Sequence, residues 1–322
     1  MKNIFEAALH NDTSVIKEYL KFGNVNICDE SHSSLLHYAA RGNSIDVANL
    51  LLDNYININI VNDNGETPLF EAVSRGELGF CKILTRYNAN GNIINKNNES
   101  VFFKAILKGR KDILDLLYDT LQINFELVNN NGENALFYAI KAYNNELFFK
   151  LADEHPSLLG QRNYFNTNLL MFAIKFDNYE VFKYLFNKLD NIYECDCEYN
   201  NVLFYAAEHA SSNIMKELLD RKPIIAGKNK NEETIFDLAM KNNHPTLDLI
   251  NNYNEGYEYV MYKRTYPFHV AVIARNYDLL DYGNPDIKKR DTLGISISDY
   301  INLLNDQIIL KMFKMQKELR PY

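Results

Sequence analysis

Tryptophan is missing from the 322 residues of this chain, whereas asparagine, isoleucine, lysine and tyrosine are used heavily. This bias is typical of an AT-rich genome, such as those of many intracellular bacteria, protists and some viruses. It is an argument from codon usage and not from physical chemistry.

Cysteine is scarce and long apolar runs are absent. The four cysteines, Cys28, Cys81, Cys195 and Cys197, do not have the spacing of a disulfide framework, which indicates free thiols in a reducing compartment. No apolar run is long enough to cross a bilayer, and residues 1–6 lead into an amphipathic helix rather than the apolar core of a secretory signal. We therefore expect a cytoplasmic protein that does not insert into membranes.

Positive charge is in the minority. The formal net charge is -8 and the isoelectric point is near 5.5, which argues against a general binder of nucleic acid or of anionic membranes. With 47% hydrophobic and 24% charged residues, the chain is globular and long enough to bury a large core. The length alone predicts two compact domains, or one elongated domain if the chain is built of repeats.

Sequence motifs of catalysis are also missing. No G-x-x-x-x-G-K-[ST] loop, G-x-S-x-G turn or H-E-x-x-H helix occurs. Cys195 and Cys197 are close in sequence, but a zinc site needs four ligands and no second pair exists, so free thiols are the favoured interpretation. We expect no enzyme activity, no cofactor and no metal, and a catalytic Cys with a distant His is the alternative that sequence leaves open.

One stretch, residues 62–72, contains a regular set of turn and helix-start signals. It reads N-D-N-G-E-T-P-L-F-E-A. Asn64 and Gly65 suit a tight turn, because they enter the left-handed backbone region at little steric cost. Thr67 suits the capping position of a helix, and Pro68 suits the first turn, where no amide hydrogen is required. The stretch therefore predicts a hairpin turn that leads directly into a helix.

The same helix-start position recurs along most of the chain. It is always Ser, Thr or Asn, the side chains that cap a helix best. The steps between successive copies are 33, 33, 34, 34, 33 and 33 residues, at Ser34, Thr67, Ser100, Asn134, Asn168, Asn201 and Thr234.

This period and these motifs resemble the ankyrin repeat, whose pattern reads D-x-x-G-x-T-P-L-H-x-A. The resemblance implies an all-α ankyrin-repeat solenoid of about ten helix-turn-helix repeats, with short β-hairpin turns and atypical terminal repeats as caps. We expect ankyrin repeats over residues 1–252, beginning with an amino-terminal cap that lacks its hairpin, and degenerate repeats with carboxy-terminal capping helices over residues 253–322. A small non-ankyrin module over the latter residues is the alternative.

The pattern degrades beyond about residue 251. Tyr266 stands in place of the capping Thr before a P-F-H stretch. Further on, we expect a helix from Ser298 to Leu304 and a final helix from Gln307 to Leu319. In the eighth repeat, Pro245 is expected in the first turn of the outer helix.

One departure from the family pattern is systematic. The position that follows P-L is His in the family, where it forms hydrogen bonds between neighbouring turns. Here it is Phe70, Phe103, Phe137 and Phe204, with His only at His37 and His269. We therefore expect a more aromatic seam between repeats, and we interpret the two histidines as structural rather than catalytic.

The resemblance also implies a concave binding face, formed by the hairpin tips and the exposed side of the inner helices. In the sixth repeat, Tyr164 and Phe165 stand where small polar turn residues are expected, with Phe176 on the same repeat and Tyr199 one hairpin further on. Exposed aromatic residues are enriched in binding hot spots, although packing between neighbouring hairpins explains them equally well. Glu208 ends an inner helix on the same expected face.

Basic residues form a second candidate feature of this face. They occur at equivalent positions of consecutive repeats, at Arg75, Lys108, Lys141 and Lys175. Such a stripe suits an acidic peptide. The alternative is a set of solvated lysines that pair with Glu66, Glu99 and Glu133.

We interpret the chain as a monomeric scaffold or adaptor that binds another protein or an acidic peptide segment on this face. Each repeat offers a few surface side chains, which suits recognition better than catalysis. The compositional bias suggests an effector or host-range protein of an intracellular pathogen, acting in the host-cell cytosol. Two alternatives are an enzyme with a cryptic catalytic module from about residue 253, and a nucleic-acid- or nucleotide-binding array.

Overall fold

The computed structural model describes residues 4–188, 192–256, 262–275, 277, 280, 286–291, 294–304 and 306–312. These residues form helices joined by turns, and their extended pairing consists of isolated antiparallel bridges. The chain divides into two compact units, Met1–Leu159 and Gly160–Tyr322, which are described separately.

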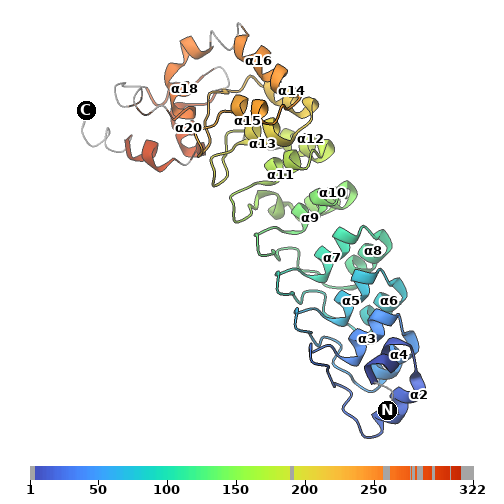
Figure 1. Ribbon diagram of the computed structural model, residues 1–322. Coiled ribbons are helices and arrows are strands. Elements are labelled where there is room, and N and C mark those ends of the chain that lie inside the picture. Colours follow the sequence, from blue (N-terminus) through green and yellow to red (C-terminus); the bar gives the residue numbers. More distant parts are fainter. Residues whose placement is uncertain are drawn as a thin grey trace. The chain divides into compact units, whose positions relative to one another are not determined.

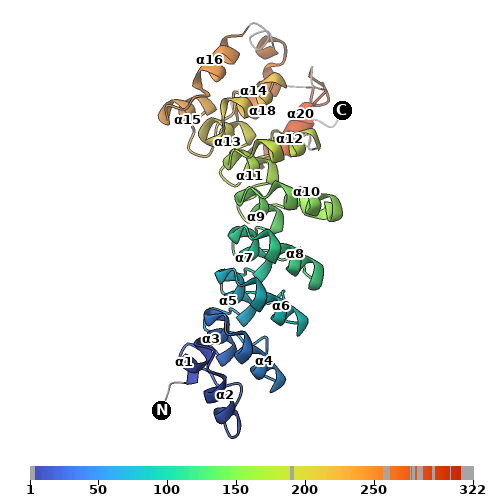
Figure 2. The same cartoon turned by 90° about the vertical axis from the view of Figure 1, so that its right-hand side faces the viewer.

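The first unit is a row of inner helices beside a row of outer helices (Figures 1 and 2). The inner helices are α1 (Ile4–Leu9), α3 (Leu35–Gly42), α5 (Pro68–Arg75), α7 (Val101–Lys108) and α9 (Ala135–Lys141). Within this unit, consecutive inner helices pack on one another, from α1 and α3 to α7 and α9. The outer helices are α2 (Thr13–Leu20), α4 (Ile45–Asp53), α6 (Leu78–Arg86), α8 (Lys111–Thr120) and α10 (Asn145–Glu154), and a 3-10 helix, η1 (Pro156–Gly160), follows them.

The second unit has three more pairs of inner and outer helices, followed by two helices that pack on each other. The inner helices are α11 (Leu169–Lys175), α13 (Val202–His209) and α15 (Ile235–Lys241), and their outer partners are α12 (Tyr179–Lys188), α14 (Ser212–Asp220) and α16 (Leu247–Glu255). Further along the chain, α18 (Pro267–Ile273) packs on α20 (Ile297–Leu304). Stacked helix pairs in both units confirm the predicted all-α repeat architecture.

The carboxy-terminal predictions have mixed outcomes. The helix expected from Ser298 to Leu304 is α20, which begins one residue earlier. Of the final helix expected from Gln307 to Leu319, residues 307–312 are helical and the rest lies outside the described residues. Pro245 was misplaced, because α16 begins only at Leu247 with Thr246 at its cap. The domain boundary after residue 252 stays a prediction.

The predicted capping residues mostly act as caps. At six of the seven positions the side chain accepts a hydrogen bond from an amide in the first helical turn, as at Thr67, where the Phe70 amide donates. The exception is Ser100, whose side chain makes no capping hydrogen bond in α7. A cap side chain satisfies an amide that would otherwise lack a partner, which is why these residue types recur here.

A turn precedes each capping residue, and an Asp or Asn five positions before the cap organises it. In residues 61–67, the Asn62 Oδ1 accepts the backbone amides of Asn64 at 2.9 Å and Glu66 at 3.1 Å, while Gly65 takes the left-handed conformation with φ of 76°. The same position is occupied by Asp29, Asn62, Asn95, Asn129, Asn163, Asp196 and Asn229. We number these hairpins 2 to 8, at residues 28–34, 61–67, 94–100, 128–134, 162–168, 195–201 and 228–234.

Within each unit, backbone hydrogen bonds join the tips of consecutive hairpins. In the first unit the Asp63 amide donates to the Ser31 carbonyl at 2.9 Å, and the Lys96 amide donates to the Asn64 carbonyl at 2.9 Å. In the second unit the Cys197 amide donates to the Phe165 carbonyl at 2.9 Å. The backbone of each of these tips is therefore held by its neighbour, and these hydrogen bonds do not involve the side chains.

The aromatic seam between repeats is confirmed. Phe70, Phe103, Phe137 and Phe204 are all at most 2% exposed. The two histidines make the polar contacts expected of them: the His37 Nε2 lies 2.9 Å from the Glu66 carbonyl oxygen, and the His269 Nε2 lies 3.0 Å from that of Lys289. Phenylalanine thus replaces a hydrogen bond by buried apolar area. Burial of apolar area stabilises the stack of repeats, but unlike a hydrogen bond it has no preferred direction.

No helix in the described ranges is both long and apolar enough to cross a bilayer.

Candidate functional site

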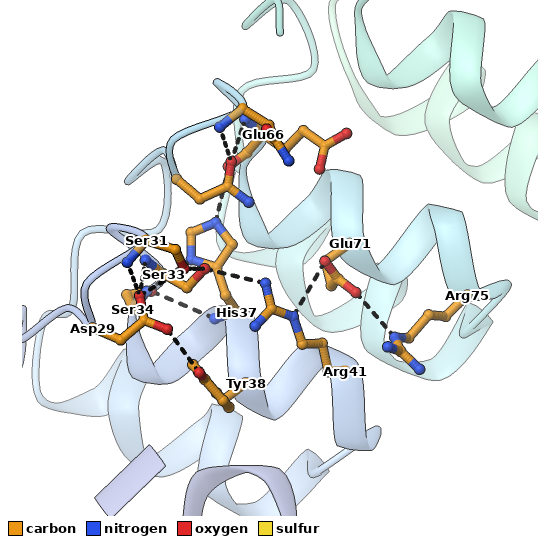
Figure 3. A network of polar contacts seen from close by, with 12 residues as sticks. Asp29, Ser31, Ser33, Ser34, His37, Tyr38, Arg41, Glu66, Glu71 and Arg75 are labelled. Atoms are coloured by element: carbon orange, nitrogen blue, oxygen red, sulfur yellow. Dashed lines mark hydrogen bonds and ion pairs between the residues drawn. The ribbon is translucent and has the colours of Figure 1, made fainter. Parts of the chain in front are cut away.

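In the first unit, charged side chains of the inner helices α3 and α5 form a connected network (Figure 3). Glu71 on α5 lies between two guanidinium groups, with Arg41 Nε at 3.4 Å and Arg75 Nε at 3.0 Å. Arg41 also donates through Nη2 to the Ser33 hydroxyl at 3.1 Å. Arg75, one of the predicted binding residues, is therefore half of a local ion pair rather than an isolated cation.

Tyrosines link the hairpins to the helices in several repeats, and the sequence analysis did not identify them. The Tyr38 hydroxyl donates to the Asp29 carboxylate at 2.7 Å, and the Tyr205 hydroxyl donates to that of Asp196 at 2.9 Å. In both cases the tyrosine lies nine positions after the turn-organising residue. An Asp or Asn followed by Tyr at this spacing is a signal that could have revealed the pairs.

Two predicted lysines of the first unit are free. Lys108 and Lys141 are exposed, and neither forms an ion pair with any residue that the structure describes. The lysines are solvated, as the alternative interpretation had it, but neither pairs with a glutamate among the described residues. The Glu99 carboxylate instead accepts from the Tyr138 hydroxyl at 2.7 Å, and that of Glu133 accepts from Asn129 Nδ2 at 2.9 Å. Both ammonium groups are therefore available to an external carboxylate.

The four basic residues share a place in their helices but not a direction. Each is the last residue of its inner helix, α5, α7, α9 or α11. Arg75 and Lys108 come eight positions after their capping residues, whereas Lys141 and Lys175 come seven positions after theirs. One residue turns a helix by about 100°, so the two pairs leave their helices in different directions. In the first unit, Arg75 and Lys108 are equivalent, and Lys141 is not.

The aromatic residues at the tip of hairpin 6 are open to solvent. Tyr164 is 70% exposed and Phe165 is 53% exposed. The backbone beneath them is held in place, since the Asn163 Oδ1 accepts the amides of Phe165 at 3.0 Å and Thr167 at 2.9 Å. Because more than half of each side chain is exposed, packing between neighbouring hairpins, which was the alternative explanation, does not account for these residues.

The other predicted residues of the second unit are less available. Phe176 is half-buried, with its ring centroid 4.8 Å from that of Phe172. Tyr199 is half-buried beneath the Arg275 guanidinium, whose carbon lies 4.2 Å from the ring centroid. Glu208 is exposed, and its carboxylate lies 3.5 Å from the His209 Nε2. Lys175 is exposed, and its charge lowers the pKa of His209 after the larger effect of burial.

The hairpins of the first unit also form a hollow that the sequence did not predict. It has a volume of about 500 Å³ and is lined by residues of hairpins 2, 3 and 4. Val61 and Ile94 contribute apolar surface there, at 41% and 40% exposure. At its edge, the His32 Nδ1 lies 2.8 Å from the Asp63 carboxylate. Exposed β-branched residues at the same position of consecutive hairpins are a recognisable signal in the sequence.

The cysteines are not poised for nucleophilic or metal chemistry. Burial raises the pKa of Cys195 to about 11, and burial together with Asp196 and Glu198 raises the pKa of Cys197. A thiol with a raised pKa carries little of the thiolate that reacts or binds metal. Among the described residues, no group of three or more His, Cys, Asp or Glu side chains is arranged to hold a metal ion.

His37 gives the first unit a pH-dependent stability. Burial lowers its pKa below the ordinary value of 6.5, and its Nδ1 accepts the Ser34 amide at 3.1 Å, so a proton on Nδ1 would face a donor. Because the unfolded state binds the proton at higher pH than the folded state, stability is full above about pH 6.5 and falls as the pH decreases toward the folded pKa. The unfolding midpoint in urea should therefore be lower at about pH 5.5 than at about pH 7.5.

His37→Gln removes this titration and replaces the imidazole by a neutral amide that can also donate and accept hydrogen bonds. The variant should lose less stability than the wild type between the two pH values. Burial also lowers the pKa of His209, His244 and His269, so part of the dependence should remain. An identical pH dependence in both proteins would contradict the role of His37.

Comparison with known families gives one clear match. A family model described as ankyrin repeats in three copies matches residues 4–95, 104–194 and 170–261, which is more than half of the chain. A comparison with curated proteins found no match.

Proposed function

Because the chain belongs to the ankyrin-repeat family, we propose that it is a scaffold or adaptor that binds a protein partner through its hairpin tips and inner helices. Ankyrin repeats imply protein interaction, and the family is typically non-catalytic.

The observation that carries the proposal is the pair of open aromatic side chains on hairpin 6. Tyr164 and Phe165 are 70% and 53% exposed on a backbone whose amides are already satisfied by Asn163. Large exposed rings cost solubility, and rigidly presented aromatic side chains bind partners at little cost in entropy. We therefore assign these two residues to the partner contact of the second unit.

In the first unit we propose a contact with an acidic segment of the partner that also carries apolar side chains. Lys108 and Lys141 have no internal counter-ion among the described residues, and Val61 and Ile94 provide apolar surface on the hairpins of the same unit. A negative segment would gain charge complementarity with the lysines, which raises association rates and specificity.

The test is an affinity capture from a lysate with the wild-type chain and two double variants. Tyr164→Ala with Phe165→Ala should lose a partner that the wild type retains. Lys108→Ala with Lys141→Ala should retain it less well, with the difference shrinking as salt rises, because screened charges contribute less. Phe176 is left unchanged, since its contact with Phe172 makes a change in stability the simpler consequence of its removal.

A matched control comes from two aromatic residues elsewhere in the chain. Phe22 and Tyr55 are 96% and 91% exposed at the ends of outer helices, away from the hairpin tips. Phe22→Ala with Tyr55→Ala should keep every partner. If the hairpin variant and this control retain the same proteins as the wild type, the assignment of hairpin 6 is wrong.

We further propose that the protein acts in a host-cell cytosol as an effector or host-range factor of an intracellular pathogen. The support is the compositional bias toward Asn, Ile, Lys and Tyr with no Trp. Expression of the tagged chain in cultured host cells, followed by imaging, tests the setting. Exclusion from the cytosol would contradict it.

A further inference from the structure

The carboxy-terminal part of the second unit does not begin as a repeat does. Residues 262–265 are helical where the repeat pattern would put a hairpin, and the Tyr266 side chain makes no capping bond to α18. The described residues between 262 and 312, which we call the terminal segment, contact hairpins 7 and 8. They therefore cover a part of hairpins 7 and 8.

Arg275 makes the central contact. Its guanidinium carbon lies 4.2 Å from the ring centroid of Tyr199 on hairpin 7, and its Nη1 donates to the Lys228 carbonyl of hairpin 8 at 2.7 Å. Its Nε donates to the Asp306 carboxylate at 3.0 Å. Both side chains of this ion pair are buried, at 9% and 2% exposure. One residue of the terminal segment thus reaches two consecutive hairpins.

Asp306 is held as firmly as Arg275. Its second oxygen accepts the amides of Ile308 at 2.9 Å and Ile309 at 3.2 Å, at the start of the last helical turns. The Tyr277 hydroxyl donates to the first oxygen at 3.2 Å. The carboxylate therefore links Arg275 to the helical residues 307–312.

An aromatic contact lies beside the ion pair. Tyr300 of α20 meets Tyr193, which precedes hairpin 7, with ring centroids 4.9 Å apart and planes at 80°. Both rings are at most 1% exposed. A hollow of about 420 Å³ between this helix and hairpins 6 and 7 is lined by Cys195, Tyr199 and Leu304 among others.

The contact also contains two unfavourable features. The Arg275 Nη2 is buried and has no hydrogen-bond partner among the described residues. A buried ion pair repays its desolvation only in part. A surface that persists with these costs is closer to a releasable contact than to a permanent core.

We propose that the terminal segment is an intramolecular ligand of hairpins 7 and 8, and that it leaves this surface by local opening so that a partner can take its place. The contact of the terminal segment with hairpins 7 and 8 and its opening involve this chain alone. The partner that replaces it rests on the proposed function, so the test below uses no partner.

Cys195 is a natural reporter of the opening. It is 6% exposed, lines the hollow beneath α20, and lies against the Arg275 guanidinium, whereas Cys197 two residues later is exposed. In the wild type, iodoacetamide should label the exposed Cys197 faster than the buried Cys195, as followed by mass spectrometry. Labelling of Cys195 should depend little on low concentrations of urea, because a local opening exposes little surface.

Hydrogen exchange separates local opening from unfolding of the unit. Amides of α18 and α20 should exchange about tenfold or more faster than those of α13, which lies in the repeat core. If α18, α20 and α13 exchange together, and Cys195 is labelled only when the unit unfolds, the terminal segment is a permanent cap and the proposal is overturned.

Two variants weaken the cover from opposite sides. Arg275→Ala should raise the labelling rate of Cys195 by about tenfold or more, since it removes three contacts at once. Loss of the guanidinium also removes a charge that favours the thiolate, so faster labelling cannot come from electrostatics. Tyr199→Asn removes only the ring, at a backbone position that Asn tolerates, and should raise the rate by a smaller factor.

The matched control is Arg221, another arginine of the second unit over an aromatic ring. Its guanidinium carbon lies 3.9 Å from the Phe186 centroid. Arg221→Ala should leave the labelling of Cys195 unchanged. If Arg275→Ala also removes the protection of α13 from hydrogen exchange, the whole unit has unfolded. The labelling of Cys195 in Tyr199→Asn is then the test of the proposal. No increase in Cys195 labelling in Tyr199→Asn would then overturn the proposal.

Discussion

Replacing Phe137 by Ala should lower the free energy of unfolding by about 3–5 kcal/mol, the usual cost of deleting a buried aromatic side chain. Phe137 is 0% exposed on α9 and stands at the position where the family pattern has a polar histidine. The cost combines the lost transfer of the ring from water with the cavity left behind, because a packed helix stack can collapse only in part.

The measurement is urea unfolding followed by circular dichroism, since the chain has no tryptophan to report by fluorescence. Phe22→Ala is the matched control, because Phe22 lies in the same unit at 96% exposure. It should change the free energy of unfolding by no more than about 0.5 kcal/mol. Equal midpoints for the two variants would show that Phe137 is not a core residue.

Asn129→Ala should be the second severe change, at about 2–4 kcal/mol, although the residue looks like an ordinary turn asparagine. It is 7% exposed, and its Oδ1 accepts the amides of Asn131 at 2.9 Å and Glu133 at 3.0 Å. Its Nδ2 donates to the Glu133 carboxylate at 2.9 Å and to the Tyr138 hydroxyl at 3.0 Å. Alanine would leave several of these buried groups without a partner, which is the expensive way to lose a hydrogen bond.

Two controls test that explanation. Asn129→Asp keeps the acceptor for both amides, and Glu133→Asn beside it removes the carboxylate that would repel the new charge, which reproduces the Asp196 and Asn200 pair of hairpin 7. This double variant should cost less than Asn129→Ala. Asn130→Ala removes an exposed neighbour whose Nδ2 donates only to the Lys96 carbonyl at 3.1 Å, and should cost less than about 1 kcal/mol. An Asn129→Ala variant as stable as Asn130→Ala would refute the role given to the buried amide.

The sequence predicted where most residues of the candidate surface lie, but not which of them are exposed, paired or covered. Sequence spacing correctly put Tyr164 and Phe165 at a hairpin tip, because the turn signals lie within a few residues of them. The Glu71–Arg75 ion pair could also have been predicted, because a Glu four positions before an Arg on one helix is a sequence signal, whereas the approach of Arg41 from α3 to the same carboxylate depends on helix packing. Sequence spacing treated Tyr199 as free, whereas Arg275, which is 76 positions later, lies over its ring.

The basic residues could also have been separated by direction. Their presence near the ends of inner helices followed from the period, yet α9 and α11 end one residue closer to their caps than α5 and α7 do. A shift of one position changes the direction of a side chain by about 100°, and counting the residues between each basic residue and its cap would have revealed it.

The sequence by itself determined the repeat, its length, its caps, its turns and its apolar seam. Each of these depends on interactions within about ten residues, where residue type and spacing dictate the geometry. Only the tertiary structure decided which surface groups are free, which pair with a neighbour and which are covered by the terminal segment. Those outcomes depend on contacts between residues far apart in the chain, as between Tyr199, Arg275 and Asp306, and on burial, which sets the cost of every unpaired group.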